Sequence, residues 1–486
     1  MCKGKLRQGR HFGIVRRKEA TCPLVPSPPK STPFNPTMNK PASRRHFVKA
    51  AAATVAAPFI LPSRVWSADT APSERLNLGF IGMGKMNSGH LNNFLGRSEV
   101  QVVAVCDVDT SRRENAKKTV EERYSKNQDA QFKGCTAYAD FRELVANKDI
   151  DAVVIATPDH WHTITAIAAI NAGKDVYCEK PLTHNIHEAV TLIKTVRGSK
   201  QILQTGSQQR SNNKEFRIAC EIVQNGVLGK IQRVETQFGN PAKPNANPEE
   251  AMEPGLDWDM WCGPAPLAPY SSVLSPRGVH GHFPAWRMTR EYGGGMICDW
   301  GAHHIDIAQW GLGEDLRGPV EIIAPEKHDE ATEGAKLVYA SGIPLTHVNK
   351  GFGVSFYGEN GEVHANRGKF KLVMGGKVVH EFIGKETKGT SLDREVVMAE
   401  RTFLADAKVK LYNSTNHHQD WLNCIKSREK PICDVEIGAS TVISCHLMNQ
   451  AYYHGGTHKW NPETHEYTSG GDPKWLTREY RGEWKV

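Results

Sequence analysis

Hydrophobic and polar residues alternate along residues 75–205 in a pattern that predicts strands and helices in turn. Short apolar runs over 77–81, 100–106, 152–156 and 175–178 are typical of buried strands. Turns marked by Gly and Pro separate them from helical stretches, such as the amphipathic one over 163–171. This alternation predicts an α/β fold whose N-terminal domain is a doubly wound parallel sheet.

The elements after residue 205 follow a different order. The pattern predicts helices over 214–224, 416–425 and 439–452, and strand-like runs recur over 232–238, 353–357, 362–365 and 369–374. These elements predict a second domain over 206–455. The polar residues 456–486, which include Trp and Pro, are expected to form a wrapping extension.

The first 68 residues predict an export signal. Residues 1–37 are rich in Pro, Ser and basic residues, which indicates a disordered extension or a mis-assigned start before Met38. Residues 43–49 (SRRHFVK) resemble the twin-arginine consensus, and the apolar run 50–61 is too short for a membrane span. We expect 38–68 to be a twin-arginine (Tat) signal that exports the cytoplasmically folded chain to the periplasm. An uncleaved membrane anchor and a basic amphipathic helix are the alternatives.

Charge and cysteine usage exclude two classes of protein. The net charge of +8 arises from residues 1–68, which hold 13 Lys or Arg and one acid, so the other 418 residues carry about −4. A basic face for nucleic acid is therefore not expected. The 11 cysteines lie singly, without a C-x-x-C pair, which argues against a disulfide framework. Cys106, Cys298 and Cys445 are interpreted as buried free thiols.

A glycine-rich turn follows the first predicted strand and suggests a dinucleotide cradle. Gly82 can form the tight turn, and Gly84 lets the backbone approach a pyrophosphate at the start of the next helix. The residues expected to form this cradle are Gly82, Met83, Gly84, Lys85 and Met86. The third glycine of the fingerprint is replaced by Asn87, which we expect to loosen the packing of helix against strand.

Asp107 ends the second predicted strand, 25 residues after Gly82. A carboxylate at this position accepts the ribose 2′-hydroxyl of NAD and repels the 2′-phosphate of NADP. Arg112 and Arg113 could favour NADP but lie a helical turn or more beyond, so NAD is preferred. The alternative is that Asp107 only caps the helix that starts near Thr110.

Two further strand ends carry a specific resemblance. The first is Thr157-Pro158-Asp159-His160-Trp161-His162, and the second is Glu179-Lys180-Pro181. Together they resemble the Gfo/Idh/MocA family, which includes glucose–fructose oxidoreductase and inositol dehydrogenase. The resemblance implies a Rossmann domain over 75–205, followed by a domain built on a large, mostly antiparallel sheet. It also implies that Thr157, Pro158, Asp159 and His162 line the cofactor path, that Glu179 contacts the cofactor ribose and that Lys180 lies beside the nicotinamide and the reacting hydroxyl.

The stretch 293–306 carries further chemistry, because Asp299 and His303 stand four residues apart on one face of a predicted helix. A carboxylate one turn from an imidazole can orient it as a general base. We assign His303 as the base, Asp299 as its orienter or a substrate ligand, and Lys180 as the group that stabilises the developing alkoxide. Adjacent histidines point to different helix faces, so no metal site is expected.

Other polar and aromatic residues are weaker candidates. The possible substrate contacts are Arg210, Trp286, Arg287 and His304. Core packing is the alternative for the aromatic residues, and packing or capping is the alternative for His304 and Asp306. We interpret His417 and His418 as surface or cap residues.

These features favour an NAD-dependent oxidoreductase of a sugar, polyol or derivative. Since free NAD is scarce outside the cytoplasm, an exported enzyme would hold its cofactor tightly. One alternative is a glycosidase that uses bound NAD in a cycle of oxidation, elimination and reduction. Another is a non-catalytic sugar- or nucleotide-binding protein. The family resemblance implies a homo-oligomer, either a dimer or a tetramer.

Overall fold

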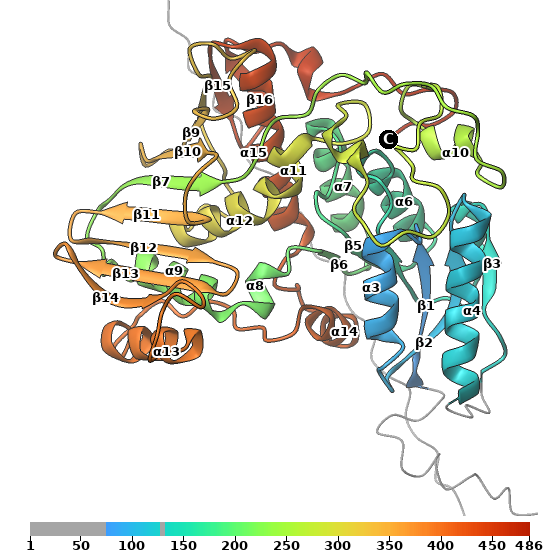
Figure 1. The fold of residues 1–486 in the computed structure, drawn as a ribbon, viewed down its shortest axis with the longest axis horizontal. Coiled ribbons are helices and arrows are strands. Elements are labelled where there is room, and N and C mark those ends of the chain that lie inside the picture. Colours follow the sequence, from blue (N-terminus) through green and yellow to red (C-terminus); the bar gives the residue numbers. More distant parts are fainter. Residues whose placement is uncertain (1–73, 127–131) are drawn as a thin grey trace, which may run out of the picture. The chain divides into compact units, whose positions relative to one another are not determined.

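The first domain is a six-stranded parallel sheet in this computed structural model (Figure 1), in which residues 74–126 and 132–486 are described. The predicted signal segment lies outside the described residues. The strand order is β3-β2-β1-β4-β5-β6, and every neighbouring pair is parallel. The strands are β1 (Leu76–Ile81), β2 (Val100–Cys106), β3 (Thr136–Tyr138), β4 (Ala152–Ile155), β5 (Asp175–Cys178) and β6 (Leu203–Thr205). The predicted doubly wound sheet is confirmed.

Helices cover both faces of this sheet because the side chains of each strand alternate between two cores. Leu78 and Phe80 of β1 pack with α3 and α4, whereas Ile81 belongs to the core on the other face. The helices are α3 (Lys85–Phe94), α4 (Thr110–Lys126), α5 (Phe141–Ala146), α6 (Asp159–Asn171) and α7 (Ile186–Arg197). Helix α6 starts four residues before the predicted 163–171 and is mostly buried rather than amphipathic, since other segments pack on its first turn.

The second domain is built on a ten-stranded sheet. Its order is β14-β13-β12-β11-β7-β10-β9-β8-β15-β16, and all neighbouring strands are antiparallel except β7 and β10. This confirms the large, mostly antiparallel sheet. Its strands are β7 (Ile231–Gln237), β8 (Glu321–Ile323), β9 (Lys336–Val338), β10 (Pro344–Val348), β11 (Val354–Gly358), β12 (Gly361–Asn366), β13 (Lys369–Met374), β14 (Lys377–Phe382), β15 (Thr457–Asn461) and β16 (Glu466–Ser469).

Several helices pack on this sheet or connect it to the first domain. Helix α12 contacts β7, β11 and α9, and α15 contacts both α12 and α7. The helices are α8 (Gln209–Asn212), α9 (Lys214–Gln224), α10 (Trp258–Cys262), η2 (Ala285–Met288), α11 (Gly295–Asp299), α12 (Gly301–Leu312), α13 (Leu392–Phe403), α14 (His417–Ser427), α15 (Val435–His454) and η3 (Pro473–Leu476).

A long segment between β7 and α11 contains no regular strand and forms its own small core around Trp258, Trp261 and Tyr292. We call residues 260–287 of this segment the roof, because they lie over the carboxyl ends of β1, β2 and β4. The last residues of the chain also return to the first domain. Arg478 donates to the carbonyl of His160, and the Trp484 ring packs against Trp161.

Within the described residues, none of the helices is both long enough and apolar enough to span a membrane. The nine cysteines of this part of the chain are buried and unpaired. This confirms the interpretation of Cys106, Cys298 and Cys445 as buried free thiols.

Candidate active site

The turn after β1 forms a cradle at the start of α3. Gly82 has φ = 82°, and a Cβ there would come within 2.9 Å of Thr157. Gly84 is the N-cap of α3, and a Cβ on it would meet nothing within 4 Å. The free amide groups of this helix end therefore face open space that can take an anionic pyrophosphate.

Asn87 does not loosen this helix as the sequence suggested. Its side chain is fully buried, and its Nδ2 donates to the carbonyls of Ile81 at 3.1 Å and Val154 at 3.3 Å. The expectation was wrong because the amide replaces the close glycine contact with hydrogen bonds. Asn87 thereby ties α3 to β1 and β4 together.

Asp107 lies at the floor of the same cavity, where burial raises its carboxyl pKa. One oxygen accepts the Met83 amide at 2.6 Å and the other accepts the Asp109 amide at 2.9 Å. Each oxygen keeps a lone pair for a ribose hydroxyl. Arg112 and Arg113 instead donate to protein acceptors, among them Gly278 O and Asp107 O, so they are not arranged to hold a 2′-phosphate.

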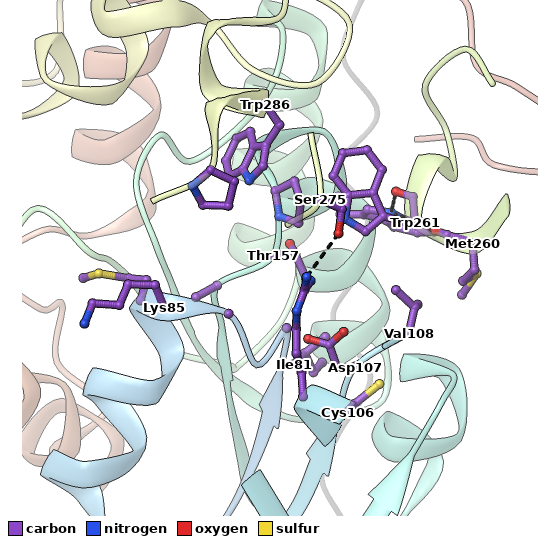
Figure 2. A pocket seen from close by; sticks show the side chains of 18 of the residues that line it. Ile81, Lys85, Cys106, Asp107, Val108, Thr157, Met260, Trp261, Ser275 and Trp286 are labelled. Atoms are coloured by element: carbon purple, nitrogen blue, oxygen red, sulfur yellow. Dashed lines mark hydrogen bonds between the residues drawn. The ribbon is translucent and has the colours of Figure 1, made fainter. Parts of the chain in front are cut away.

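A cavity of about 830 Å³ lies between this cradle and the roof. Figure 2 shows Trp261, Ser275 and Trp286 across the cavity from Ile81 and Asp107. The buried Oγ1 of Thr157 has no partner in the structure, so it can bond a bound ligand. These features fit an NAD molecule, with its pyrophosphate at Gly84 and its adenosine ribose at Asp107.

A second cavity of about 1300 Å³ opens beside the first. The two share Met86, Ala156, Thr157, Pro284, Trp286 and Arg287 as lining residues. The second cavity is also lined by Asp159, His162, Glu179, Lys180, Phe283, Asp299, Trp300, His303 and Arg367. The structure therefore brings the candidate residues of both domains to one place, next to the dinucleotide cavity.

Lys180 follows the carboxyl end of β5, where Asp299 of the second domain holds its side chain. Its Nζ forms an ion pair with the Asp299 carboxylate and donates to the Asp299 carbonyl at 3.1 Å. His162 braces the backbone nearby, since its ring nitrogens lie 2.7 Å from Pro181 O and 3.0 Å from Thr157 O. Lys180 also lowers the pKa of the buried Asp299 carboxyl, against the effect of burial.

The single helix expected to carry Asp299 and His303 is not formed. Helix α11 ends at Asp299, and α12 begins at Gly301 after a break at Trp300. Asp299 is paired with Lys180, and the buried Nδ1 of His303 has no hydrogen-bond partner. The expectation of Asp299 as the orienter of His303 is corrected, because the carboxylate is taken up by the Lys180 ammonium.

Two titratable groups of the second cavity are perturbed in opposite directions. Burial, with the charges of Lys180 and Arg367, holds the pKa of His303 well below its usual value, so the imidazole is neutral at pH 7. Burial raises the pKa of Asp159 to about 7, although Arg287 opposes the shift. Asp159 can therefore exchange a proton at neutral pH, a property that its position in a sequence motif did not reveal.

Two family models match this chain. The oxidoreductase family model with an NAD-binding Rossmann fold covers residues 76–207, and the model of the family's C-terminal alpha/beta domain covers 221–369. The chain belongs to the Gfo/Idh/MocA family. Both matched regions contribute residues to the two cavities described above.

The most similar relatives are distant in sequence. An uncharacterized oxidoreductase of Synechocystis is 22% identical over 78% of this chain and 95% of its own length. Inositol 2-dehydrogenase 2 of Saccharopolyspora erythraea is 28% identical over 56% of this chain and 78% of its own. A glycosyl hydrolase family 109 protein of Shewanella is 30% identical, but over only 34% of this chain and 35% of its own.

Solved structures share the fold. An aldose-aldose oxidoreductase of Caulobacter crescentus aligns with a TM-score of 0.51 and 16% identity over 79% of this chain and 99% of its own. The WlbA dehydrogenase of Chromobacterium violaceum, in complex with NADH and UDP-GlcNAcA, aligns with a TM-score of 0.52 and 18% identity. The alignment covers 79% of this chain and 95% of that protein's chain.

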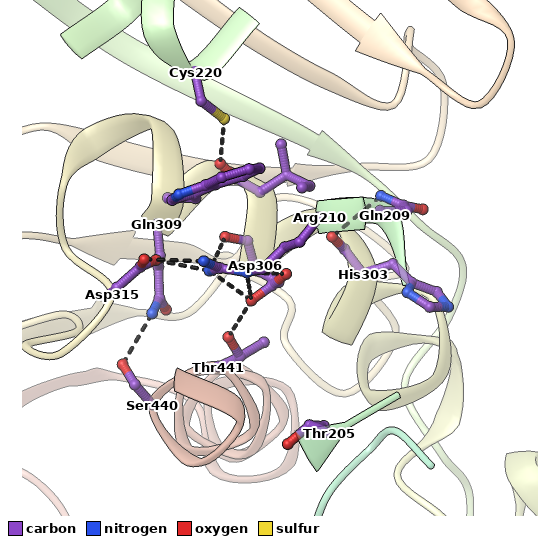
Figure 3. Close-up of polar contacts among 12 residues, drawn as sticks. Thr205, Gln209, Arg210, Cys220, His303, Asp306, Gln309, Asp315, Ser440 and Thr441 are labelled. Carbon is purple, nitrogen blue, oxygen red and sulfur yellow. Dashed lines mark hydrogen bonds and ion pairs between the residues drawn. The ribbon is translucent and has the colours of Figure 1, made fainter. Parts of the chain in front are cut away.

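Two residues of this Gfo/Idh/MocA protein that the sequence suggested as substrate contacts, Arg210 and His304, lie outside the second cavity. Arg210 is buried against α12, where it pairs with Asp306 and Asp315 and stacks on Trp310 (Figure 3). His304 is buried and bonds Gln237 O. Neither lines the second cavity, because each points into the packing between the helices and the sheet. Trp286 and Arg287 do line it.

Sequence reasoning missed the environment of Glu179. His90 of α3 lies 3.0 Å from the Glu179 carboxylate, and its other nitrogen lies 2.8 Å from His418. His417 contacts Thr205 O and is 1% exposed. The surface interpretation of His417 was wrong, and His418 is half-buried, since α14 packs on the Rossmann domain.

Arg367 was also missed. It occupies the two-residue turn between β12 and β13, and the only sequence signal was a polar, glycine-containing turn between two predicted strands. No group of three or more His, Cys, Asp or Glu side chains with metal-ligand geometry occurs among the described residues.

Proposed function

We propose that this oxidoreductase transfers a hydride between NAD and a hydroxyl carbon of a sugar, polyol or derivative. One observation carries the proposal: Lys180, Asp299 and His303 line a cavity continuous with the dinucleotide cavity. The inositol dehydrogenase among the relatives supports a polyhydroxylated substrate.

NAD, held by the Gly82–Gly84 turn and Asp107, supplies the hydride acceptor. The Lys180 ammonium stabilises negative charge as the hydroxyl proton leaves. Neutral His303 has a lone pair for that proton, but its lowered pKa means that it holds the proton weakly. Asp159, with a pKa of about 7 in the same cavity, is a group that can hold it at neutral pH.

The test is a comparison of Lys180→Ala with Lys180→Arg. We expect Lys180→Ala to lose at least about 100-fold in turnover, while it retains NAD, because the dinucleotide cradle lies in other segments. Lys180→Arg keeps the charge and should retain more activity. Absorbance at 340 nm reports turnover, and the cofactor content of the purified protein reports binding. An undiminished rate in Lys180→Ala would reject the proposal.

The second candidate function is a glycosidase that uses bound NAD transiently. The similarity to a glycosyl hydrolase family 109 protein supports it, as does the roof over the dinucleotide cavity. This enzyme would release a free sugar without net change in absorbance at 340 nm. A dehydrogenase would instead accumulate NADH in proportion to oxidised product.

We also propose that NAD stays bound between turnovers. The roof residues Leu274, Ser275 and Pro276 line the cavity from above, and Arg112 donates to the Ser275 hydroxyl at 3.2 Å. This contact holds the roof against α4. Mass spectrometry of the purified protein after denaturation tests whether a cofactor remains.

Export and assembly complete the proposal. The twin-arginine segment supports transport of the folded, cofactor-loaded chain to the periplasm, and cell fractionation of an Arg44→Lys/Arg45→Lys variant tests it. A homo-oligomer is supported by the polar face of the large sheet, which includes Glu235, Tyr357 and His364 around a shallow hollow. Light scattering coupled to gel filtration measures the subunit number.

A further inference from the structure

Arg367 presents an unused cation to the second cavity. Its buried Nη2 has no hydrogen-bond partner, and no ion pair of Arg367 occurs among the described residues. The side chain as a whole is half-buried, and leaving its buried Nη2 without an acceptor has a cost in free energy. The Arg367 side chain therefore has a hydrogen-bond donor for which the described residues provide no acceptor.

The guanidinium is fixed in place rather than free to swing. Its Nε donates to Gln209 Oε1 at 2.9 Å, and its plane lies 4.7 Å from the centre of the Trp300 ring. The adjacent Gly368 amide donates to Glu215 at 2.8 Å, which anchors the turn to α9. These contacts occupy the Nε side, and since Nη2 is buried, Nη1 is the group left for a ligand in the cavity.

The same contacts fix the position of the Arg367 guanidinium relative to His303. Gln209, which is fully buried, also donates from its Nε2 to the carbonyl of His303 at 3.3 Å. One amide thus connects the guanidinium with the backbone of His303. A substrate whose hydroxyl reaches His303 can place another substituent against Arg367.

The nearby carboxylates do not neutralise Arg367. Glu179 is bound by His90 at 3.0 Å, and Asp299 is paired with Lys180. Lys180, Arg287 and Arg367 give the cavity three cations, against Asp299, Glu179 and Asp159. Lys180 and Arg287 both lie against the Asp299 carboxylate, so among the described residues Arg367 is the cation of this cavity that has no carboxylate partner.

We propose that Arg367 is the specificity residue for a carboxylate on the substrate, so that the enzyme acts on a sugar acid rather than a neutral sugar. The proposal rests on the proposed function and names its substrate class. A carboxylate fits because its charged oxygen can accept a charge-assisted hydrogen bond from the guanidinium.

The test uses matched pairs of probes on the protein with its bound cofactor: glucuronate with glucose, galacturonate with galactose, and gluconate with glucitol. Calorimetry measures binding, and absorbance at 340 nm measures oxidation. We expect at least one acid to bind and react at least tenfold better than its neutral partner. Glucose 6-phosphate and glucose 6-sulfate are included, and a preference for either over every carboxylate would overturn the carboxylate assignment.

Variants separate recognition from structure. Arg367→Gln should reduce the acid-to-neutral ratio at least tenfold, mainly through KM, and Arg367→Lys should restore part of it. Arg233→Gln, an exposed arginine on β7 of the same sheet, is the matched control and should leave the ratio unchanged. An unchanged ratio in Arg367→Gln, or no acid bound in preference to its partner, would overturn the proposal. Failure of the proposed function is distinct, because it would abolish oxidation but not acid binding.

Discussion

Asp159 begins α6 and is 4% exposed on the wall of the second cavity. Burial raises its pKa to about 7 from an ordinary value of 3.8. Below pH 3.8 the carboxyl is protonated in the folded and the unfolded chain alike. Between these values only the folded chain keeps the proton, so the stability that protonation gives is lost as the pH rises to 7.

Asp159→Asn should therefore remove the part of the pH dependence of the unfolding free energy that arises from this carboxyl. We expect the unfolding free energy of the variant, relative to the parent, to increase from pH 4 to 7 by up to about 1.4 kcal/mol per unit and to level off above pH 8. Urea unfolding at fixed pH values measures it. Asp149→Asn, at an exposed position, is the control whose curve should stay parallel to the parent. A pH-independent difference for Asp159→Asn would contradict the shifted pKa.

Asn87 offers a second prediction for a single side chain. Asn87→Ala removes both hydrogen bonds from Nδ2 to Ile81 O and Val154 O and should lower the unfolding free energy by about 1–2 kcal/mol. Asn92→Ala, on the exposed side of the same helix, should change it little. Chemical denaturation measures both. Equal effects of the two substitutions would show that Asn87 does not tie α3 to the sheet.

Among the elements, the roof has the clearest consequence for the cofactor. Arg112 of α4 bonds Gly278 O at 3.1 Å and Ser275 Oγ at 3.2 Å, and it also contacts Pro276 O. These bonds join a helix of the Rossmann domain to a segment inserted in the second domain. This segment lines the cavity opposite the glycine turn, so we expect it to slow the release of NAD.

Arg112→Ala should accelerate the dissociation of NAD at least about tenfold, equivalent to about 1.4 kcal/mol. The bound fraction that survives repeated gel filtration, and the decay of cofactor fluorescence on dilution, measure this rate. Arg123→Ala, an exposed arginine on the same helix, serves as the control and should keep the parent rate. If both variants retain NAD equally, the roof does not hold the cofactor.

For the whole molecule, buried ion pairs connect distant parts of the chain. Arg210 follows the last strand of the Rossmann sheet and pairs with Asp306 of α12, which also accepts a bond from Thr441 of α15. Arg478 near the C-terminus pairs with the buried Glu188 of α7. The active-site cavity lies between the domains that these pairs connect.

Arg210→Met should destabilise the whole fold by about 3–5 kcal/mol, since it leaves the Asp306 carboxylate buried without its partner. The double variant Arg210→Met/Asp306→Leu removes both charges and should recover part of the loss. Thermal unfolding monitored by circular dichroism compares the two. A substrate-binding role for Arg210 would instead appear as a raised KM in a protein of unchanged stability.

The sequence predicted most strands of the Rossmann sheet and the residues at their carboxyl ends, but not the partners of those residues. Hydrophobic periodicity is local, so β1, β2, β4 and β5 could be read directly, together with Gly82 and Asp107, whereas Lys180 was identified through the resemblance to the family. The partner of Asp299 could not be read, because the carboxylate pairs with Lys180 of another domain rather than with the nearby His303. Arg367 reaches the cavity, and His90 reaches the Glu179 carboxylate, only through tertiary packing.

By itself the sequence determined the fold class and the dinucleotide turn, because each depends on neighbouring residues and on the fixed geometry of parallel strands; the strand-end lysine was added by the resemblance to the family. Only the tertiary structure decided which charges are paired. Arg210 is taken up by ion pairs away from the second cavity, whereas Arg367 lines that cavity. The physical reason is that burial and ion pairing depend on segments more than 100 residues apart, as between Lys180 and Asp299.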